Sequence, residues 1–285
     1  MQNIMFMRSK VPGDRPKMQD FTRPFKMLRF VAILIPATLY MACFGYGTVL
    51  FALTGASLFT KLYGFTTAQT GLILSIPLLI GGGIGELSAG WVTDWLSNRY
   101  AQRHNGERLP EARLTAIWGV LLIPIGLIIE GVCLSHADTV SWVGSAFGMG
   151  IANMGLQIST TTIYAYATDV SDVFSPKKKE LCSDKIHDHS VRPQSAEVST
   201  ILNIFRQIFS CLISFYASVC SQSVMNIYTN EFRSRLPFAE RIGIQFAWLT
   251  FAMVVVVLLI PVLLLRVSGS RWRKLPSQLA PDTET

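Results

Sequence analysis

The sequence predicts an all-α polytopic membrane protein with six transmembrane helices. Half of its 285 residues are hydrophobic and only 15% are charged, against about a quarter in ordinary soluble domains. The charges also avoid long stretches, and residues 30–60 contain none. A membrane-spanning helix needs about 20 consecutive, mostly apolar residues, whereas a soluble helix keeps a polar stripe on one side. Long uncharged runs therefore favour the membrane over a soluble core.

Six stretches reach the length of a span, and the segments between them are polar or basic. The expected spans are residues 31–53, 70–94, 114–134, 142–167, 199–222 and 244–266. The expected connecting segments are residues 1–29, 95–113, 168–197 and 223–243, with a tail at 267–285. Pro36, Pro77 and Pro124 lie in the middle of the first three spans, where each removes a helix hydrogen bond and permits a kink. The pairs Gly81/Gly85 and Gly144/Gly148 have four-residue spacing, which predicts close approach between helices.

The positions of the basic residues predict the orientation of these spans. If six spans alternate, 20 of the 25 lysines and arginines fall on one side, four fall on the other, and Arg206 lies within a span. The basic side of a membrane protein faces the cytosol. We therefore expect both termini in the cytosol, together with the loops 95–113 and 168–197. The expected location is the plasma membrane, with the vacuolar membrane as the open alternative.

Few ionisable residues lie at membrane depth, and each is a functional candidate because burying a charge there is costly. Glu86 follows the sequence GGGIG in the second span, and Glu130 lies near the outer end of the third. For Glu86 we favour a functional role over the alternative, a carboxyl group that its apolar surroundings keep neutral. A carboxyl group that is neutral in this way is also what a proton carrier requires. Arg206 lies in the fifth span and has two open interpretations. It either contacts substrate or forms an ion pair that locks helix ends together, and the candidate partners are Asp94, Asp169 and Glu197.

Polar residues mark one face of the fourth span and one face of the fifth. Asn153, Gln157 and Tyr164 fall near one face by the 3.6-residue period, and Asn203 and Arg206 share another. For most polar residues of the fourth span, packing and interhelical hydrogen bonds are the favoured interpretation. The candidates for substrate binding or proton coupling are Glu86, Asn153, Gln157, Tyr164, Asn203 and Arg206.

Nothing in the sequence predicts an enzyme, a cofactor or a metal site. No P-loop and no zinc-protease or serine-hydrolase motif occurs. The polar cluster between Cys182 and His189 has a spacing that matches no recognised zinc pattern. The net charge of +7 sits in the loops and at the termini, where it sets orientation, so no nucleic-acid partner is expected.

The stretch GWVTDWLSNRYAQRHNGERLPEARL resembles the loop between helices eight and nine of fungal major facilitator superfamily transporters, in the drug:proton antiporter-like branch. Three further segments resemble the same family: RPFKMLRF, YAYATD and SAEVSTILNIFRQIFSCLISFY. The resemblance implies a fold of two six-helix bundles, of which this chain matches the second, helices seven to twelve. It also implies a loop that latches helix ends and gates the conformational change. The loop residues concerned are Gly90, Asp94, Arg99, Arg103, Gly106, Glu111 and Arg113.

The resemblance implies a secondary active transporter of a small organic molecule. Proton-coupled efflux of a drug or secondary metabolite is the preferred expectation. One alternative is a truncated, non-transporting relic, or a half that acts only by association with another bundle. A lesser alternative is uptake of a cationic nutrient. The expected partners are the lipid bilayer, a small-molecule substrate and an N-terminal six-helix bundle, because one bundle alone cannot provide alternating access.

Residues 170–192 interrupt a connection that the family makes briefly. The segment is polar and has no periodicity, which is typical of a disordered insert. It begins with Val-Ser, the two residues that the fungal 5′ splice consensus GTAAGT encodes in frame. The expectation is a disordered insert or a retained intron.

Overall fold

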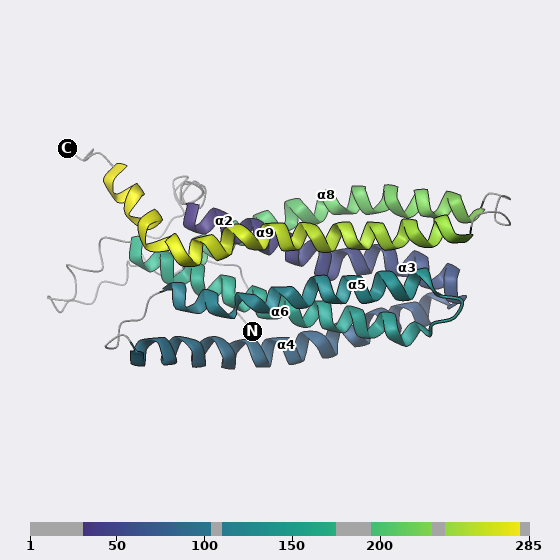
Figure 1. Cartoon of the computed structure of the whole chain (residues 1–285), viewed down its shortest axis with the longest axis horizontal. Helices are drawn as coiled ribbons and strands as arrows, with labels where there is room; N and C mark the ends of the chain where they lie inside the picture. Colours follow the sequence, from purple (N-terminus) through teal and green to yellow (C-terminus); the bar gives the residue numbers. More distant parts are fainter. Residues whose placement is uncertain (1–30, 104–109, 175–194, 230–236, 280–285) are drawn as a thin grey trace, which may run out of the picture.

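A computed structural model describes residues 31–103, 110–174, 195–229 and 237–279. Every regular element in these ranges is a helix, and none is a strand. The helices lie side by side along one long axis (Figure 1). The all-α polytopic architecture predicted from composition is therefore confirmed.

The first span is one continuous helical rod built from three parts. It comprises α2 (Val31–Phe44), a π-helical stretch η2 (Gly45–Val49) and α3 (Leu50–Tyr63). The rod ends at Gly64, whose positive φ of 68° is the left-handed conformation with which glycine commonly terminates a helix. It therefore runs ten residues beyond the predicted end at residue 53.

The remaining elements follow in chain order. They are α4 (Thr67–Arg103), the 3₁₀ helix η3 (Pro110–Leu121), α5 (Leu122–Ser135), α6 (Trp142–Phe174), α8 (Ser195–Thr229) and α9 (Pro237–Leu279). The carboxyl end of α4, the start of η3 and the carboxyl end of α6 lie at the same end of the bundle (Figure 1). At that end, the Nε atom of Arg113 lies 2.8 Å from a carboxylate oxygen of Asp169. This contact joins the start of η3 to the last turns of α6.

The predicted count of six apolar spans needs a correction. Within the described residues, five helices are long and apolar enough to cross a membrane: Val31–Thr60, Thr67–Gln102, Arg113–Ser135, Val198–Phe215 and Gln245–Val267. The predicted fourth span, 142–167, forms the long helix α6 but does not meet the same test of composition. The reason is its amide and hydroxyl side chains. They are tolerated because α6 packs against α4, α5 and α2, so much of its surface contacts other helices.

Two predicted boundaries also move, and some predicted features lie outside the described residues. Helix α4 continues to Arg103, so Arg99 and Arg103 are helical where a loop was expected. Helix α6 continues to Phe174, so the first residues of the expected insert are helical. The amino-terminal segment 1–29, Gly106 and residues 175–194, with the polar cluster from Cys182 to His189, lie outside the described residues.

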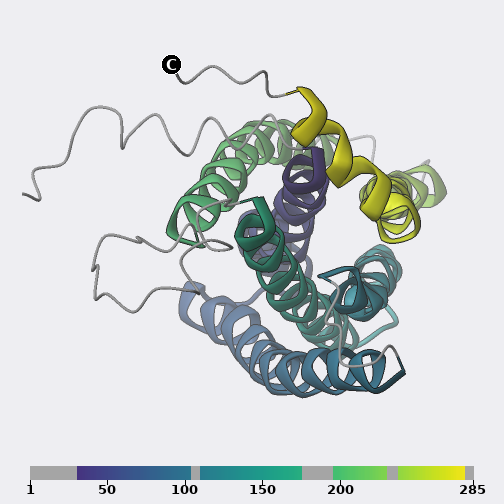
Figure 2. The same ribbon diagram turned by 90° about the vertical axis from the view of Figure 1, so that its left-hand side faces the viewer.

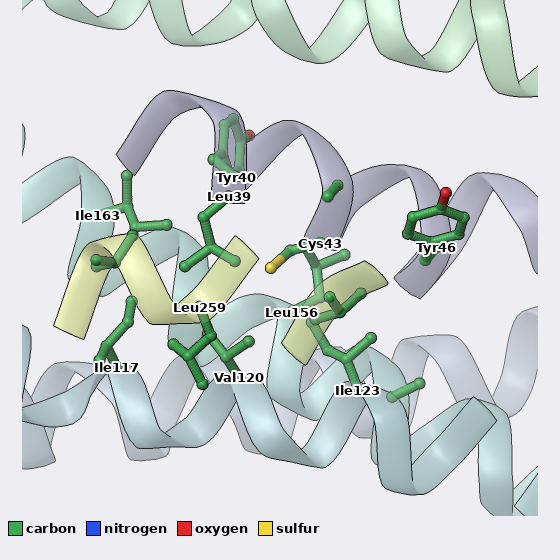
Figure 3. Close-up of a cluster of buried hydrophobic side chains, with 14 of the residues drawn as sticks. Leu39, Tyr40, Cys43, Tyr46, Ile117, Val120, Ile123, Leu156, Ile163 and Leu259 are labelled. Carbon is green, nitrogen blue, oxygen red and sulfur yellow. The ribbon is translucent and has the colours of Figure 1, made fainter. Parts of the chain in front are cut away.

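The bundle core lies between α2, α6, α9 and the rod formed by η3 and α5. In the view along the bundle, α4 and α8 lie on opposite sides, with α2 and α6 between them (Figure 2). Figure 3 shows Leu39 and Cys43 of α2 pointing towards Val120 and Leu259, whereas Tyr40 lies on the opposite side of α2. The outer helix surfaces keep large exposed hydrophobic side chains, such as Leu79 and Leu87 on α4. Such surfaces suit a lipid environment.

Candidate functional site

A polar cavity of about 300 Å³ lies between α2, α6 and α8. Its wall contains an aromatic pair, several hydroxyl and amide groups, and one cation. The lining residues are Tyr40, Phe44, Thr48, Asn153, Leu156, Gln157, Thr160 and Arg206. Three residues predicted from the sequence thus meet here: Asn153, Gln157 and Arg206. A small concave site with a few convergent polar groups is the usual form of a small-molecule site.

Helix α2 contributes a wall that the sequence-based candidates missed. Tyr40, Phe44 and Thr48 follow one another at four-residue spacing, so their side chains share one face. Thr48 lies in the π-helical stretch, a local widening that is frequent at functional sites. The signal available in the sequence was this four-residue ladder of aromatic and hydroxyl side chains in an otherwise aliphatic span.

Gly45 brings this wall close to α8. A Cβ atom at Gly45 would lie 2.5 Å from the ring of Phe209. Phe209 also makes an edge-on ring contact with Tyr46, with centroids 5.6 Å apart. The absence of a side chain at Gly45 therefore sets the distance between the helices that carry Phe44 and Arg206.

Asn153 ties three helices together at one edge of the cavity. Its side-chain nitrogen donates to the backbone carbonyl of Leu78 on α4, and its side-chain oxygen accepts from the hydroxyl of Thr48 at 3.2 Å. The side chain is buried. The packing interpretation holds for Asn153, because its amide is used to position α6 against α4 and α2.

Arg206 supplies the only positive charge among the lining residues of this cavity. Its guanidinium carbon lies 4.5 Å from the centre of the Phe44 ring, which is a cation–π contact. Its Nε atom is buried and has no hydrogen-bond partner. The expected ion-pair interpretation is not supported by the described residues. Asp169 contacts Arg113, Asp94 is exposed, and the side chain of Glu197 lies outside the described residues.

Tyr164 and Asn203 form a polar contact between the two helices that flank the cavity. The Tyr164 hydroxyl donates to the side-chain oxygen of Asn203 at 3.3 Å. The Tyr164 ring also packs edge-on against Tyr40, with centroids 5.5 Å apart. The two predicted residues therefore lie next to the cavity wall, joined to it through Tyr40, rather than in its lining.

Glu86 lies elsewhere. It is exposed on α4 and accepts a hydrogen bond from the hydroxyl of Thr161 at 3.3 Å, and it is not among the lining residues. The apolar surroundings that the alternative interpretation of Glu86 requires are therefore not found in this structure. The physical reason is that GGGIG turns Gly81 and Gly85 towards α6, while the residue after them projects from the seam between α4 and α6.

The predicted gating loop is only partly described. Gly90 and Asp94 lie on α4, and Arg99 places its guanidinium carbon 5.0 Å from the centre of the Trp95 ring. The side chains of Arg103 and Glu111 lie outside the described residues, as does all of Gly106. The one ion pair of the loop within the described residues is that between Arg113 and Asp169.

Reversing the charge at position 113 tests this ion pair. Both side chains are partly exposed, with 24% and 36% of their surface accessible, so the pair contributes at most about 1 kcal/mol. We expect Arg113→Asp to lower the melting temperature modestly in detergent, and the exchanged pair Arg113→Asp/Asp169→Arg to recover most of the loss. Arg266→Asp, an exposed change on α9, serves as the control. No recovery in the exchanged pair would show that the contact contributes nothing specific.

Among the described residues, Glu130 carries a fully buried carboxyl group. Glu130 lies at membrane depth in the predicted third span, but it was not among the predicted site residues. Glu130 is 0% exposed, and one of its oxygens accepts a hydrogen bond from the indole nitrogen of Trp248 at 3.2 Å. The other oxygen has no partner. This contact joins α5 to α9.

Curated proteins similar to this chain are fungal transporters. The MFS transporter cpaT of Aspergillus oryzae is 33% identical over 162 residues, which is 56% of this chain and 32% of that protein. The MFS-type transporter atr4 of Stereocaulon alpinum is 33% identical over 149 residues, 52% of this chain and 26% of that protein. The probable efflux pump mfs2 of Aspergillus flavus is 29% identical over 153 residues, 53% of this chain and 35% of that protein.

These similarities confirm the resemblance to fungal major facilitator superfamily transporters, over about half of the chain. The chain spans about a third of the length of these curated relatives or less. No family model matches the chain. No solved structure matches it either.

Proposed function

We propose that this relative of fungal major facilitator transporters forms one bundle of a secondary active transporter, and that its polar cavity binds a small organic molecule. The observation that carries the proposal is the cavity itself. It is polar and is built from three helices widely separated in sequence, of which α2 and α8 belong to stretches long and apolar enough to cross a membrane. Irregular or polar groups at membrane depth are tolerated where they line a cavity, and transporter sites lie near the middle of the membrane between helices.

The proposed direction is proton-coupled efflux of a drug or secondary metabolite. One similar protein carries the name of a probable efflux pump. The described residues offer carboxyl groups that can exchange a proton, with Glu86 beside α6 as the first candidate. Transport and not catalysis is the proposed activity, because the cavity combines binding groups without a nucleophile and base held in contact.

The proposed partner is an N-terminal six-helix bundle, because alternating access is the rocking of one bundle against another. The proposed location is the plasma membrane, with the basic ends of the helices and both termini in the cytosol. The alternative is a relic, or a half that acts only through association.

A yeast strain deleted for its own efflux pumps tests the proposal. The chain is expressed alone and together with the N-terminal bundle of a fungal relative, and efflux of preloaded fluorescein, an organic anion, is recorded with and without a proton ionophore. We expect ionophore-sensitive efflux only when both bundles are present, and loss of that efflux with Gln157→Ala. Leu79→Ala, a change on the exposed face of α4, is the matched control. Absence of efflux from the paired bundles favours the relic.

Glu86→Gln tests the coupling role within the same cells. We expect pH-gradient-driven efflux to fall by about tenfold or more, because the amide cannot carry the proton, while exchange of labelled substrate without a gradient persists. Unchanged gradient-driven efflux would remove Glu86 from the mechanism. Thr161→Val, which removes only the hydroxyl that contacts Glu86, is expected to have a smaller effect.

A further inference from the structure

Arg206 carries a charge that nothing in its described surroundings balances. A guanidinium group stays protonated in proteins, and a charged group at membrane depth is retained where it faces a cavity or an opposite charge. Arg206 is half-buried and lines the cavity. Its cost in the membrane interior therefore calls for a counter-charge.

No carboxylate in the described part of the chain supplies that counter-charge. The cavity lining contains no acidic residue. Three carboxyl groups in the described residues have other partners: Asp169 contacts Arg113, Glu86 contacts Thr161, and Glu130 contacts Trp248. The recorded contact of the guanidinium is the ring of Phe44, and its Nε atom is buried without a partner. The aromatic face stabilises the cation only in part.

The remaining wall of the cavity suits a planar organic group beside that cation. Phe44, Tyr40 and Leu156 present aromatic and aliphatic surface. Gln157 adds an amide on α6. The volume of about 300 Å³ is at the small end of ligand pockets, which span about 300–1,000 Å³.

We infer that the cavity binds an organic anion, with a carboxylate or a similar acidic group against Arg206 and its apolar part against Phe44 and Tyr40. The inference rests on the proposed role of the cavity as a substrate site, and it names the charge of the substrate. Arginine forms strong, directional contacts with carboxylates, often through two parallel hydrogen bonds. An unbalanced arginine also opposes a cationic substrate, so the nutrient-cation alternative is disfavoured.

Three probes of nearly the same shape and different charge test the inference: 4-fluorobenzoate, 4-fluorobenzamide and 4-fluorobenzamidine. The full chain is reconstituted in phosphatidylcholine nanodiscs, and binding is measured from the fluorine NMR line width of each probe. We expect the benzoate to bind at least about tenfold more tightly than the neutral amide, as a charge-assisted contact requires. The cationic amidine is expected to bind most weakly.

Variants test whether the charge of Arg206, rather than the shape of the cavity, causes the preference for the benzoate. Arg206→Gln is expected to weaken benzoate binding about tenfold or more while leaving the amide nearly unchanged, and Arg206→Lys to retain part of the preference. Arg266→Gln removes one exposed positive charge on α9 and is expected to change neither. Helical circular dichroism and size-exclusion profiles establish that each variant folds. If Arg206→Gln does not fold, Arg206→Lys and the ranking of the three probes on the unaltered chain still show whether the cavity prefers anions.

The outcomes distinguish the two proposals. If the three probes bind equally and all are weakened by Gln157→Ala, the cavity is a ligand site and the inferred preference for anions is wrong. Tighter binding of the amidine than of the benzoate also overturns the inference. If none of the probes binds, or if Gln157→Ala and Arg206→Gln affect none of them, the cavity is not a ligand site and the proposed function fails with it.

Discussion

Replacing Gly81 with alanine is expected to destabilise the bundle by about 2–3 kcal/mol, the range for over-packing a close interface. The Cβ atom of an alanine there would overlap the backbone carbonyl of Gly150 on α6. A backbone group cannot rotate away as a side chain can, so the two helices must separate. The neighbouring contact strengthens this effect, because a Cβ atom at Gly85 would lie 2.7 Å from the carbonyl oxygen of Met154.

Gly83 provides a matched control two residues away on the same helix. It is exposed, and a Cβ atom there would meet nothing within 4 Å. Because glycine in a helix interior is less favourable than alanine by about 0.5–1 kcal/mol, Gly83→Ala is expected to leave stability unchanged or to raise it slightly. The measurement is the temperature at which half of the detergent-solubilised chain is lost from the monodisperse peak of a size-exclusion column. Equal melting temperatures for the two variants would contradict the tight α4–α6 seam.

Gly81→Ala is also expected to disturb the polar cavity. Asn153 spans the seam, donating to Leu78 of α4 and accepting from Thr48 of α2. A Cβ atom at Gly82 would lie 2.9 Å from its side-chain nitrogen. Separation of α4 from α6 therefore breaks a contact that positions the cavity wall. Gly81→Ala is expected to weaken ligand binding as well as to lower stability.

The helical class and the approximate positions of the helices followed from the uncharged stretches, whereas the lengths of the helices did not. Predicted ends were set by the thickness of a membrane, and helices continue past it wherever no stop signal intervenes. After residue 94 the chain has neither proline nor glycine until Gly106, and α4 continues to Arg103. The end of α3 could have been found from Gly64, because a glycine in the left-handed conformation commonly ends a helix.

The residues that α6 contributes to the candidate site were predictable from the sequence. The residues that face them from other helices were not. The polar face of α6 follows from the helical period, and it places Asn153 and Gln157 at the cavity. Which residues face that helix depends on packing between distant segments. Thr48 lies 105 residues from Asn153, and nothing local to either position indicates their hydrogen bond. The close glycine contacts of Gly81 and Gly148 were predicted correctly, because small residues at four-residue spacing indicate the interface on each helix separately.

Glu130 and Trp248 show the same limit, since they are 118 residues apart in sequence. The sequence showed a carboxyl group at membrane depth and left its partner unknown. Its partner is a neutral indole, and no described cation lies against it. The groups that interact with the carboxyl are the indole of Trp248 on α9 and the thiol of Cys133 on α5 itself. The pair therefore acts as a hydrogen-bonded contact between α5 and α9 rather than as a salt bridge.

Glu130→Ala is expected to destabilise the bundle by about 2–4 kcal/mol, because it leaves a cavity and leaves the buried indole N–H of Trp248 without an acceptor. Glu130→Gln is expected to cost less than about 1 kcal/mol. Its amide oxygen can accept the same hydrogen bond from Trp248, and its nitrogen takes the place of an oxygen that has no partner. The difference between the two variants isolates the hydrogen-bond acceptor from the volume of the side chain. Denaturation of the chain in mixed lipid–detergent micelles provides the free energies of unfolding.

A double-mutant cycle decides whether the contact itself stabilises the bundle. Glu130→Met and Trp248→Phe each remove one polar partner and leave the other buried and unpaired, so each is expected to cost about 1–3 kcal/mol. In the double variant neither unpaired group remains, and its cost is expected to fall clearly below the sum of the two. Strict additivity would mean that the indole and the carboxyl group act independently. A large loss of unfolding free energy with Glu130→Gln would instead show that the carboxyl group is needed for its proton. Glu130 would then be a second candidate for proton coupling.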